Sequence, residues 1–210
     1  FHTVGYRPTP ADGFPAIGRP AKRDGLYVAV THSGVTLAPA IGLFAAAARR
    51  AAAVGLDYVE LHFAHGYLVH TFLSPIANQR TDQWGGSYAN RMRFPVEVVR
   101  RIRAVVGADF IVIFRIAAMD MLQGGMSWDE VVQLGQAIEK AGATIISTHF
   151  TWHESAVPTI STRVPRAAFA GVTGRLAKEL GIPTITSNRI NMPEVAEQVL
   201  AAGHADLVSM

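Results

Sequence analysis

Residues 57–67, with the sequence DYVELHFAHGY, decide the fold because an apolar strand pattern runs directly into a cluster of polar rings. Three further apolar, β-branched runs lead into polar residues in the same way, and a fifth closes the series. The five predicted strands are Asp57–His62, Phe110–Ile116, Thr144–His149, Thr184–Ser187 and Asp206–Met210. Helical patterns alternate with them at 36–54, 88–106, 128–141, 168–180 and 193–202. This alternation predicts an α/β protein with a parallel sheet.

Two parallel architectures compete for this pattern. A doubly wound nucleotide-binding fold would carry a glycine-rich phosphate turn, and the sequence contains neither G-x-G-x-x-G nor a P-loop. Instead, polar residues stand at the strand ends, at His62, Arg115, His149 and Asn188-Arg189. In a (β/α)8 TIM barrel the carboxyl ends of the strands converge on one site, which explains such residues better than core packing does. We therefore predict a barrel.

Composition excludes several function classes. The chain has no Cys, which excludes disulfides, thiolate metal sites, iron–sulfur clusters and a cysteine nucleophile. No apolar run reaches the ~18 residues of a membrane span, so we expect no transmembrane helix. The net charge of +3 is not gathered into a basic run with aromatic residues, so we expect no nucleic-acid partner. The sequence shows no secretory signal pattern, which predicts the cytoplasm.

His62, His65 and Tyr67 are the candidate chemical groups, because all three follow one strand towards the same predicted mouth. Two imidazoles can hold the carbonyl oxygen of an activated substrate, and a phenol can donate a proton to carbon. Metal binding by the histidine pair is one alternative, but no Cys lies near in sequence to complete a site. A pair of hydrogen-bonded structural histidines is the other alternative.

Several motifs of this region resemble the Old Yellow Enzyme family of FMN oxidoreductases. They are His62-x-x-His65-Gly66-Tyr67-Leu68, Phe72–Pro75, Asn78–Ser87 and Asn90-Arg91-x-Arg93-Phe94. Within that family, Gly142–Thr148, Trp152-His153-Glu154, Val157–Ile160 and Asn188–Asn191 are most similar to bacterial NADPH-dependent 2,4-dienoyl-CoA reductases. The resemblance covers residues 46–210 and implies a partial barrel of about strands 4 to 8. We interpret the Asn78–Arg93 stretch as a structural brace with ion pairs.

The resemblance implies roles for individual residues. Tyr67 would be the proton donor, and His62 and His65 would polarise the substrate carbonyl. His153 would be a second proton-handling residue, and Glu154, from the same motif, would bind substrate. These roles imply a small-molecule substrate, either an unsaturated acyl-CoA or an enone.

The resemblance also implies the cofactor site. Arg115 would lie beside the flavin ring, and Asn188 and Arg189 would bind the FMN phosphate. NADPH would be the reductant. Related full-length reductases also hold an iron–sulfur cluster, for which this chain has no ligands, and we expect no metal site.

Residues 1–45 differ from the rest, because they are similar to the C-terminal end of FAD-dependent amino-acid oxidases. The similarity rests on the Arg7-Pro8 turn and on His32-Ser33-Gly34 before a helix. We therefore predict two segments, 1–45 and 46–210, joined inside one helix. An FAD-dependent oxidase remnant, and an inactive fragment made of two flavoenzyme pieces, remain the alternatives. The chain begins with Phe1 and stops inside a strand pattern, which predicts a fragment with exposed strand edges that self-associates as a homo-oligomer.

Overall fold

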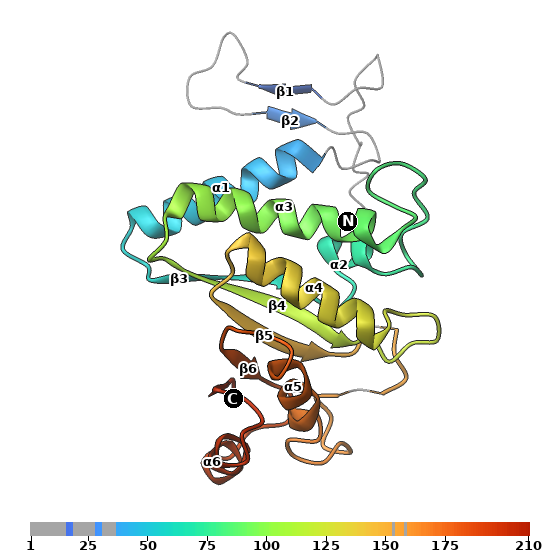
Figure 1. Cartoon of the computed structure of the whole chain (residues 1–210), viewed down its shortest axis with the longest axis vertical. Coiled ribbons are helices and arrows are strands. Elements are labelled where there is room, and N and C mark those ends of the chain that lie inside the picture. The colour runs from blue at the N-terminus through green and yellow to red at the C-terminus, as the bar shows by residue number, and fades with distance from the viewer. Residues whose placement is uncertain (1–15, 19–27, 31–36, 153, 158) are drawn as a thin grey trace, which may run out of the picture.

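The computed structural model describes residues 16–18, 28–30, 37–152, 154–157 and 159–210 (Figure 1). Seven strands are present in this part of the chain: β1 (Ala16–Gly18), β2 (Val28–Val30), β3 (Tyr58–Phe63), β4 (Ile111–Met119), β5 (Ile145–Phe150), β6 (Thr184–Thr186) and β7 (Leu207–Val208). Six helices accompany them: α1 (Leu37–Ala53), α2 (Leu68–Leu73), α3 (Tyr88–Val106), α4 (Trp128–Ala141), α5 (Ala170–Ala177) and α6 (Pro193–Ala201).

Strands β3 to β7 form one sheet in which neighbours are parallel and follow the order of the sequence. All five strands predicted from residue 57 onward are present, with bounds that differ by a few residues. Helices α3 and α4 occupy the predicted ranges, whereas α5 is shorter than predicted and the short α2 was not predicted. The α/β class and the parallel sheet are therefore confirmed. The consecutive strand order is the one a barrel requires.

The two faces of the sheet differ because side chains alternate along each strand. One face is apolar and buried, and its aromatic residues contact one another: the ring centroids of Phe63 and Phe114 lie 5.1 Å apart, and those of Phe44 and Phe63 5.5 Å. Helices α1, α4 and α5 cover it, and α1 lies beside α3 (Figure 1). The register places His62 opposite Arg115, and Arg115 opposite Ser147, on the other face. That face carries the polar groups.

Helix α4 shows how local sequence fixes the ends of these elements. The Ser127 hydroxyl accepts a hydrogen bond from the Glu130 amide, and the Glu130 carboxylate accepts one from the Ser127 amide, which completes a capping box. The helix ends at Gly142, whose left-handed backbone (φ 106°) suits glycine. Pro193 opens α6 at its first turn, where a missing amide proton costs nothing.

The segment between α2 and α3 is held by polar side chains. Asn78 donates to the carbonyls of Phe72 (2.6 Å) and Trp84 (2.8 Å), and Arg91 binds the Leu73 carbonyl and the Glu130 carboxylate. Arg80 pairs with Asp82. This segment is a structural brace with ion pairs, as predicted.

Strands β1 and β2 pair antiparallel and form a separate two-stranded sheet. Helix α1 runs without a break through residue 45, where the two predicted segments would join. The predicted division into 1–45 and 46–210 stays a prediction. Among the described residues, no helix is long and apolar enough to cross a membrane.

Candidate functional site

Backbone strain gathers at the carboxyl edge of the five-stranded sheet. Six described residues other than glycine have a left-handed backbone, and five of them lie within three residues after the end of a strand. These five are His65 after β3, Met121 after β4, Thr151 after β5, and Asn188 and Arg189 after β6. Such conformations cost free energy and concentrate at functional sites. The carboxyl edge is therefore the candidate site.

Four aromatic rings contact one another at this edge. The ring centroids of His62 lie 5.2 Å from those of both His65 and Tyr67, and His65 stacks on Tyr67 at 5.9 Å with an interplanar angle of 3°. His149, from the end of β5, lies 3.5 Å from His65 between ring centroids. Tyr67 is 49% exposed, so its ring is accessible from outside. The predicted chemical residues His62, His65 and Tyr67 are thus brought together.

Arg115 connects this ring cluster to the middle of the sheet. One guanidinium nitrogen pairs with the Glu60 carboxylate at 3.1 Å, and another lies 3.3 Å from His149 Nδ1. Burial lowers the pKa of His149 to about 2, and the neighbouring His65 and Arg115 act in the same direction. His149 is therefore a neutral imidazole at any working pH. Because Arg115 can only donate, Nδ1 accepts and Nε2 carries the proton.

The loop after β6 forms the adjoining wall of the site. Asn188 donates to the Thr159 hydroxyl (2.7 Å) and accepts from the Ser187 hydroxyl (2.8 Å), and Arg189 donates to the Val164 carbonyl (2.9 Å). These bonds hold the two left-handed residues in place. A cleft of about 320 Å³ lies here, lined by Arg115, His149, Ser187, Asn188, Arg189 and Asn191 among others.

Three buried polar atoms on this side of the sheet have no hydrogen-bond partner among the described residues. They are Arg115 Nε, Ser147 Oγ and His149 Nε2. Leaving buried polar atoms unpaired is costly, and each such group in a native structure calls for an explanation. Two of the three atoms are N–H donors, and Arg115 and Arg189 add positive charge beside them. This donor set fits an anionic ligand rich in acceptor atoms, such as a flavin mononucleotide.

Glu154 and His153 are the two remaining predicted site residues. Glu154 is exposed on the loop after β5 and is not among the residues that line the cleft. His153 lies outside the described residues. Within the described part of the chain, no group of three or more His, Cys, Asp or Glu side chains is arranged to hold a metal ion.

His149 was predicted as a strand-end polar residue but was not assigned to the site. The signal that could have placed it there is the register, because alternate residues of neighbouring parallel strands share a face. Arg115 is opposite Ser147, and His149 lies two residues further along the same strand on the same face.

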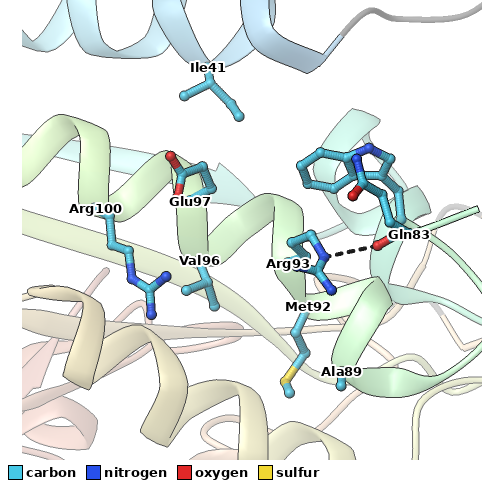
Figure 2. Close-up of a pocket in the computed structure, with 9 residues that line it drawn as sticks. Ile41, Gln83, Ala89, Met92, Arg93, Val96, Glu97 and Arg100 are labelled. Atoms are coloured by element: carbon cyan, nitrogen blue, oxygen red, sulfur yellow. Dashed lines mark hydrogen bonds between the residues drawn. The ribbon is translucent and has the colours of Figure 1, made fainter.

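A larger cavity lies elsewhere. It measures about 570 Å³ and is lined by Ile41 of α1, by Gln83 and Trp84, and by residues of α3. Figure 2 shows Ile41, Met92 and Val96 around it, with Arg93 donating to the Gln83 carbonyl at 2.9 Å. Its lining is apolar with scattered charges and brings no set of reactive groups together. The smaller cleft at the carboxyl edge is the one lined by Arg115, His149 and Asn188.

Comparison with known proteins gives a consistent result. The sequence model of the NADH:flavin oxidoreductase / NADH oxidase family matches residues 20–210. A metal reductase of Desulforamulus reducens is 41% identical over 174 residues, which cover 83% of this chain and 26% of the relative. An NADH oxidase of Thermoanaerobacter brockii is 38% identical over 169 residues, with coverage of 80% and 26%.

Among solved structures, a 2-naphthoyl-CoA reductase in complex with 2-naphthoyl-CoA superimposes with a TM-score of 0.81 at 30% identity. The alignment covers 87% of this chain and 28% of that protein. The chain thus spans about a quarter of the length of these three proteins. The family match begins at residue 20, ahead of the boundary predicted near residue 45.

Proposed function

Because the chain belongs to the NADH:flavin oxidoreductase / NADH oxidase family, we propose that its carboxyl edge is part of an FMN-dependent active site that reduces activated C=C bonds. The observation that carries the proposal is the juxtaposition of two features. The cationic cleft with its unpaired N–H donors adjoins the His62, His65 and Tyr67 rings through His149. A cofactor site and a proton donor therefore share one edge.

The residues of the cleft would hold the flavin. Arg115 is fixed by Glu60 and His149, so its guanidinium is a preorganised cation for the flavin ring. Asn188 and Arg189 would bind the phosphate, in the region where barrels often place one. When bound, FMN supplies hydride, which it takes from NADPH, to the β- or δ-carbon of the substrate.

The ring cluster would complete the reduction. His62 and His65 donate hydrogen bonds to the substrate carbonyl oxygen, which develops negative charge as hydride arrives at carbon. Tyr67 then gives its phenolic proton to the neighbouring carbon, so one hydride and one proton saturate the double bond. The half-exposed Tyr67 ring allows solvent to return the proton.

We propose an unsaturated acyl-CoA thioester or a simple enone as the substrate, within a reaction of the 2,4-dienoyl-CoA reductase type. The support for a thioester is the relative solved with 2-naphthoyl-CoA, itself an unsaturated acyl-CoA. His153 and Glu154, on the loop after β5, are proposed as a second proton-handling residue and a substrate contact. Turnover of a dienoyl-CoA that is unaffected by His153→Ala would favour the enone.

The test begins with the cofactor. The chain is purified, denatured, and its released flavin is identified by chromatography, in parallel with a full-length protein that contains the same sequence. FMN as the main species is the expected result. FAD would instead support the oxidase interpretation of residues 1–45, and absence of flavin from both proteins would support the inactive fragment.

A further inference from the structure

Behind the ring cluster lies a buried histidine that the mechanism does not use. His70, on α2, is fully buried, and its Nε2 lies 2.9 Å from Asp120 Oδ1, which is also buried. The other ring nitrogen, Nδ1, accepts a hydrogen bond from the Gly66 amide at 2.9 Å. Because Nδ1 accepts, the ring carries its proton on Nε2, the nitrogen that lies beside the carboxylate.

Asp120 is itself fixed in place. Its Oδ2 accepts a hydrogen bond from the Met126 amide at 2.8 Å, so the carboxylate joins the loop after β4 to α2. An aspartate behind a histidine sets both the tautomer and the orientation of the imidazole. The chain of contacts therefore runs from the Met126 amide through Asp120 and His70 to the Gly66 amide.

Gly66 is the point where this chain of contacts meets the active site, because it lies between His65 and Tyr67. Its backbone is left-handed (φ 84°), and a Cβ there would lie 2.5 Å from the Trp152 ring. The Trp152 ring also packs on His70 at 4.6 Å between centroids, and its backbone bridges to His65. The loop is thus in close contact with the Trp152 ring and hydrogen-bonded to His70.

We propose that His70 and Asp120 are positioning residues that set the placement of Tyr67 and His65 through the Gly66 amide. This inference rests on the proposed function for what the positioned rings do, but the positioning itself is a property of this chain. A proton donor displaced by about 1 Å can lose about 10²-fold in rate, so a small loop shift has a large effect.

Two substitutions of His70 separate positioning from packing. His70→Asn places an amide oxygen near the position of Nδ1 and keeps an acceptor for the Gly66 amide, whereas His70→Leu keeps apolar bulk and removes both polar contacts. Ile138→Val is the matched control, because it truncates a buried side chain on α4 and does not touch this loop.

The first readout needs no cofactor. Amide hydrogen exchange at Gly66 should be about tenfold faster in His70→Leu than in the parent, because its hydrogen bond is gone, and near the parental rate in His70→Asn. Unchanged exchange in His70→Leu, or equal exchange in both variants, would overturn the proposal. Faster exchange in Ile138→Val as well would show general loosening and would also overturn it.

The second readout uses the flavin-loaded full-length protein in rapid-mixing experiments. His70→Leu should slow substrate reduction by about 10- to 100-fold and slow flavin reduction by less than about threefold, with most of the loss recovered in His70→Asn. Equal slowing of both half-reactions would contradict the positioning role. If the parent protein binds no flavin, the proposed function fails, while the exchange experiment still decides whether His70 positions the loop.

Discussion

The two edges of the five-stranded sheet are built in opposite ways. At the amino edge, Arg103 donates to the carbonyls of Gly142 (2.8 Å), Gly107 (2.6 Å), Ala108 (3.2 Å) and Phe110 (2.7 Å) and to the Thr144 hydroxyl (2.9 Å). The Thr144 hydroxyl in turn accepts from the Val112 amide. At the carboxyl edge, strained residues follow the strands, and Arg115 Nε, Ser147 Oγ and His149 Nε2 are unpaired among the described residues.

We infer from this difference that the amino edge contributes to stability and the carboxyl edge to function. A guanidinium that contacts five acceptors locks the end of α3 to the starts of β4 and β5, and all three of its nitrogens are bonded within the chain. The carboxyl edge, by contrast, has N–H donors without a hydrogen-bond partner among the described residues, so a ligand can accept from them. Proteins accept these local losses where a site must bind something. Substitutions at the two edges should therefore have different consequences.

The largest effect is expected from Tyr67→Phe at the carboxyl edge. Loss of the phenolic proton donor should slow substrate reduction by ~10²–10⁴-fold, because carbon protonation loses its general acid. Flavin reduction by NADPH needs no phenol and should be nearly unchanged, and the exposed side chain should contribute little to stability. Rapid-mixing kinetics of both half-reactions and thermal unfolding measure this. Equal slowing of both halves would remove Tyr67 from the role of proton donor.

The second largest effect is expected from a substitution at the amino edge. Arg103→Met should lower the free energy of unfolding by about 2–3 kcal/mol, because it leaves the carbonyls of Gly142 and Phe110 and the Thr144 hydroxyl, all in partly buried contacts, without this donor. Arg103→Lys should recover only part of this, since a single ammonium cannot reach all five acceptors. Urea unfolding measures the loss, and flavin content per folded molecule should not change. A variant as stable as the parent would show that the amino edge is not the stabilising one.

The sequence predicted the local elements of the fold more successfully than the contacts that form the site. Helix α4 was predicted to the residue because a capping box and a glycine stop are local signals. Helix α2 was missed because its six residues are held by Asn78 and Arg91, which lie outside the helix and bind its Phe72 and Leu73 carbonyls. At the site, His62, His65, Tyr67 and Arg115 were found from their positions at strand ends. The roles of His149 and His70 depend on register and on a loop fold, so they emerged only in three dimensions.

The third prediction concerns pH. The pKa of His149 is about 2 in the folded chain and near 6.5 when unfolded, so between these values the unfolded state binds one more proton. Stability should therefore be fully present above pH 6.5 and fall as the pH drops below it, by up to about 1.4 kcal/mol per pH unit from this group. Urea unfolding at pH 7, 6 and 5 measures the slope. His149→Gln should flatten it, and a variant with the parental slope would mean that another group dominates.

The smallest effect is expected from substitutions that compare the threonines at the two ends of β5. Thr144, before the strand, has its hydroxyl bonded to Arg103 and an ordinary backbone, whereas Thr151, after the strand, has φ 82°, which a β-branched residue tolerates poorly. Thr151→Gly relieves that strain but loses the hydrogen bonds of the hydroxyl to the carbonyls of Trp152 (3.2 Å) and Val157 (3.3 Å). Glycine also adds entropy to the unfolded chain, so the net gain in stability should be only about 0.5 kcal/mol.

The same change at Thr144 is the matched control and has the opposite sign. Thr144→Gly relieves no strain and leaves Arg103 and the Val112 amide each without one partner, so it should lower the free energy of unfolding by about 1–2 kcal/mol. Parallel urea titrations of the two variants compare the edges within one strand. If both substitutions destabilise the chain equally, the backbone at Thr151 stores no strain, and the contrast between the edges reduces to the unpaired polar atoms alone.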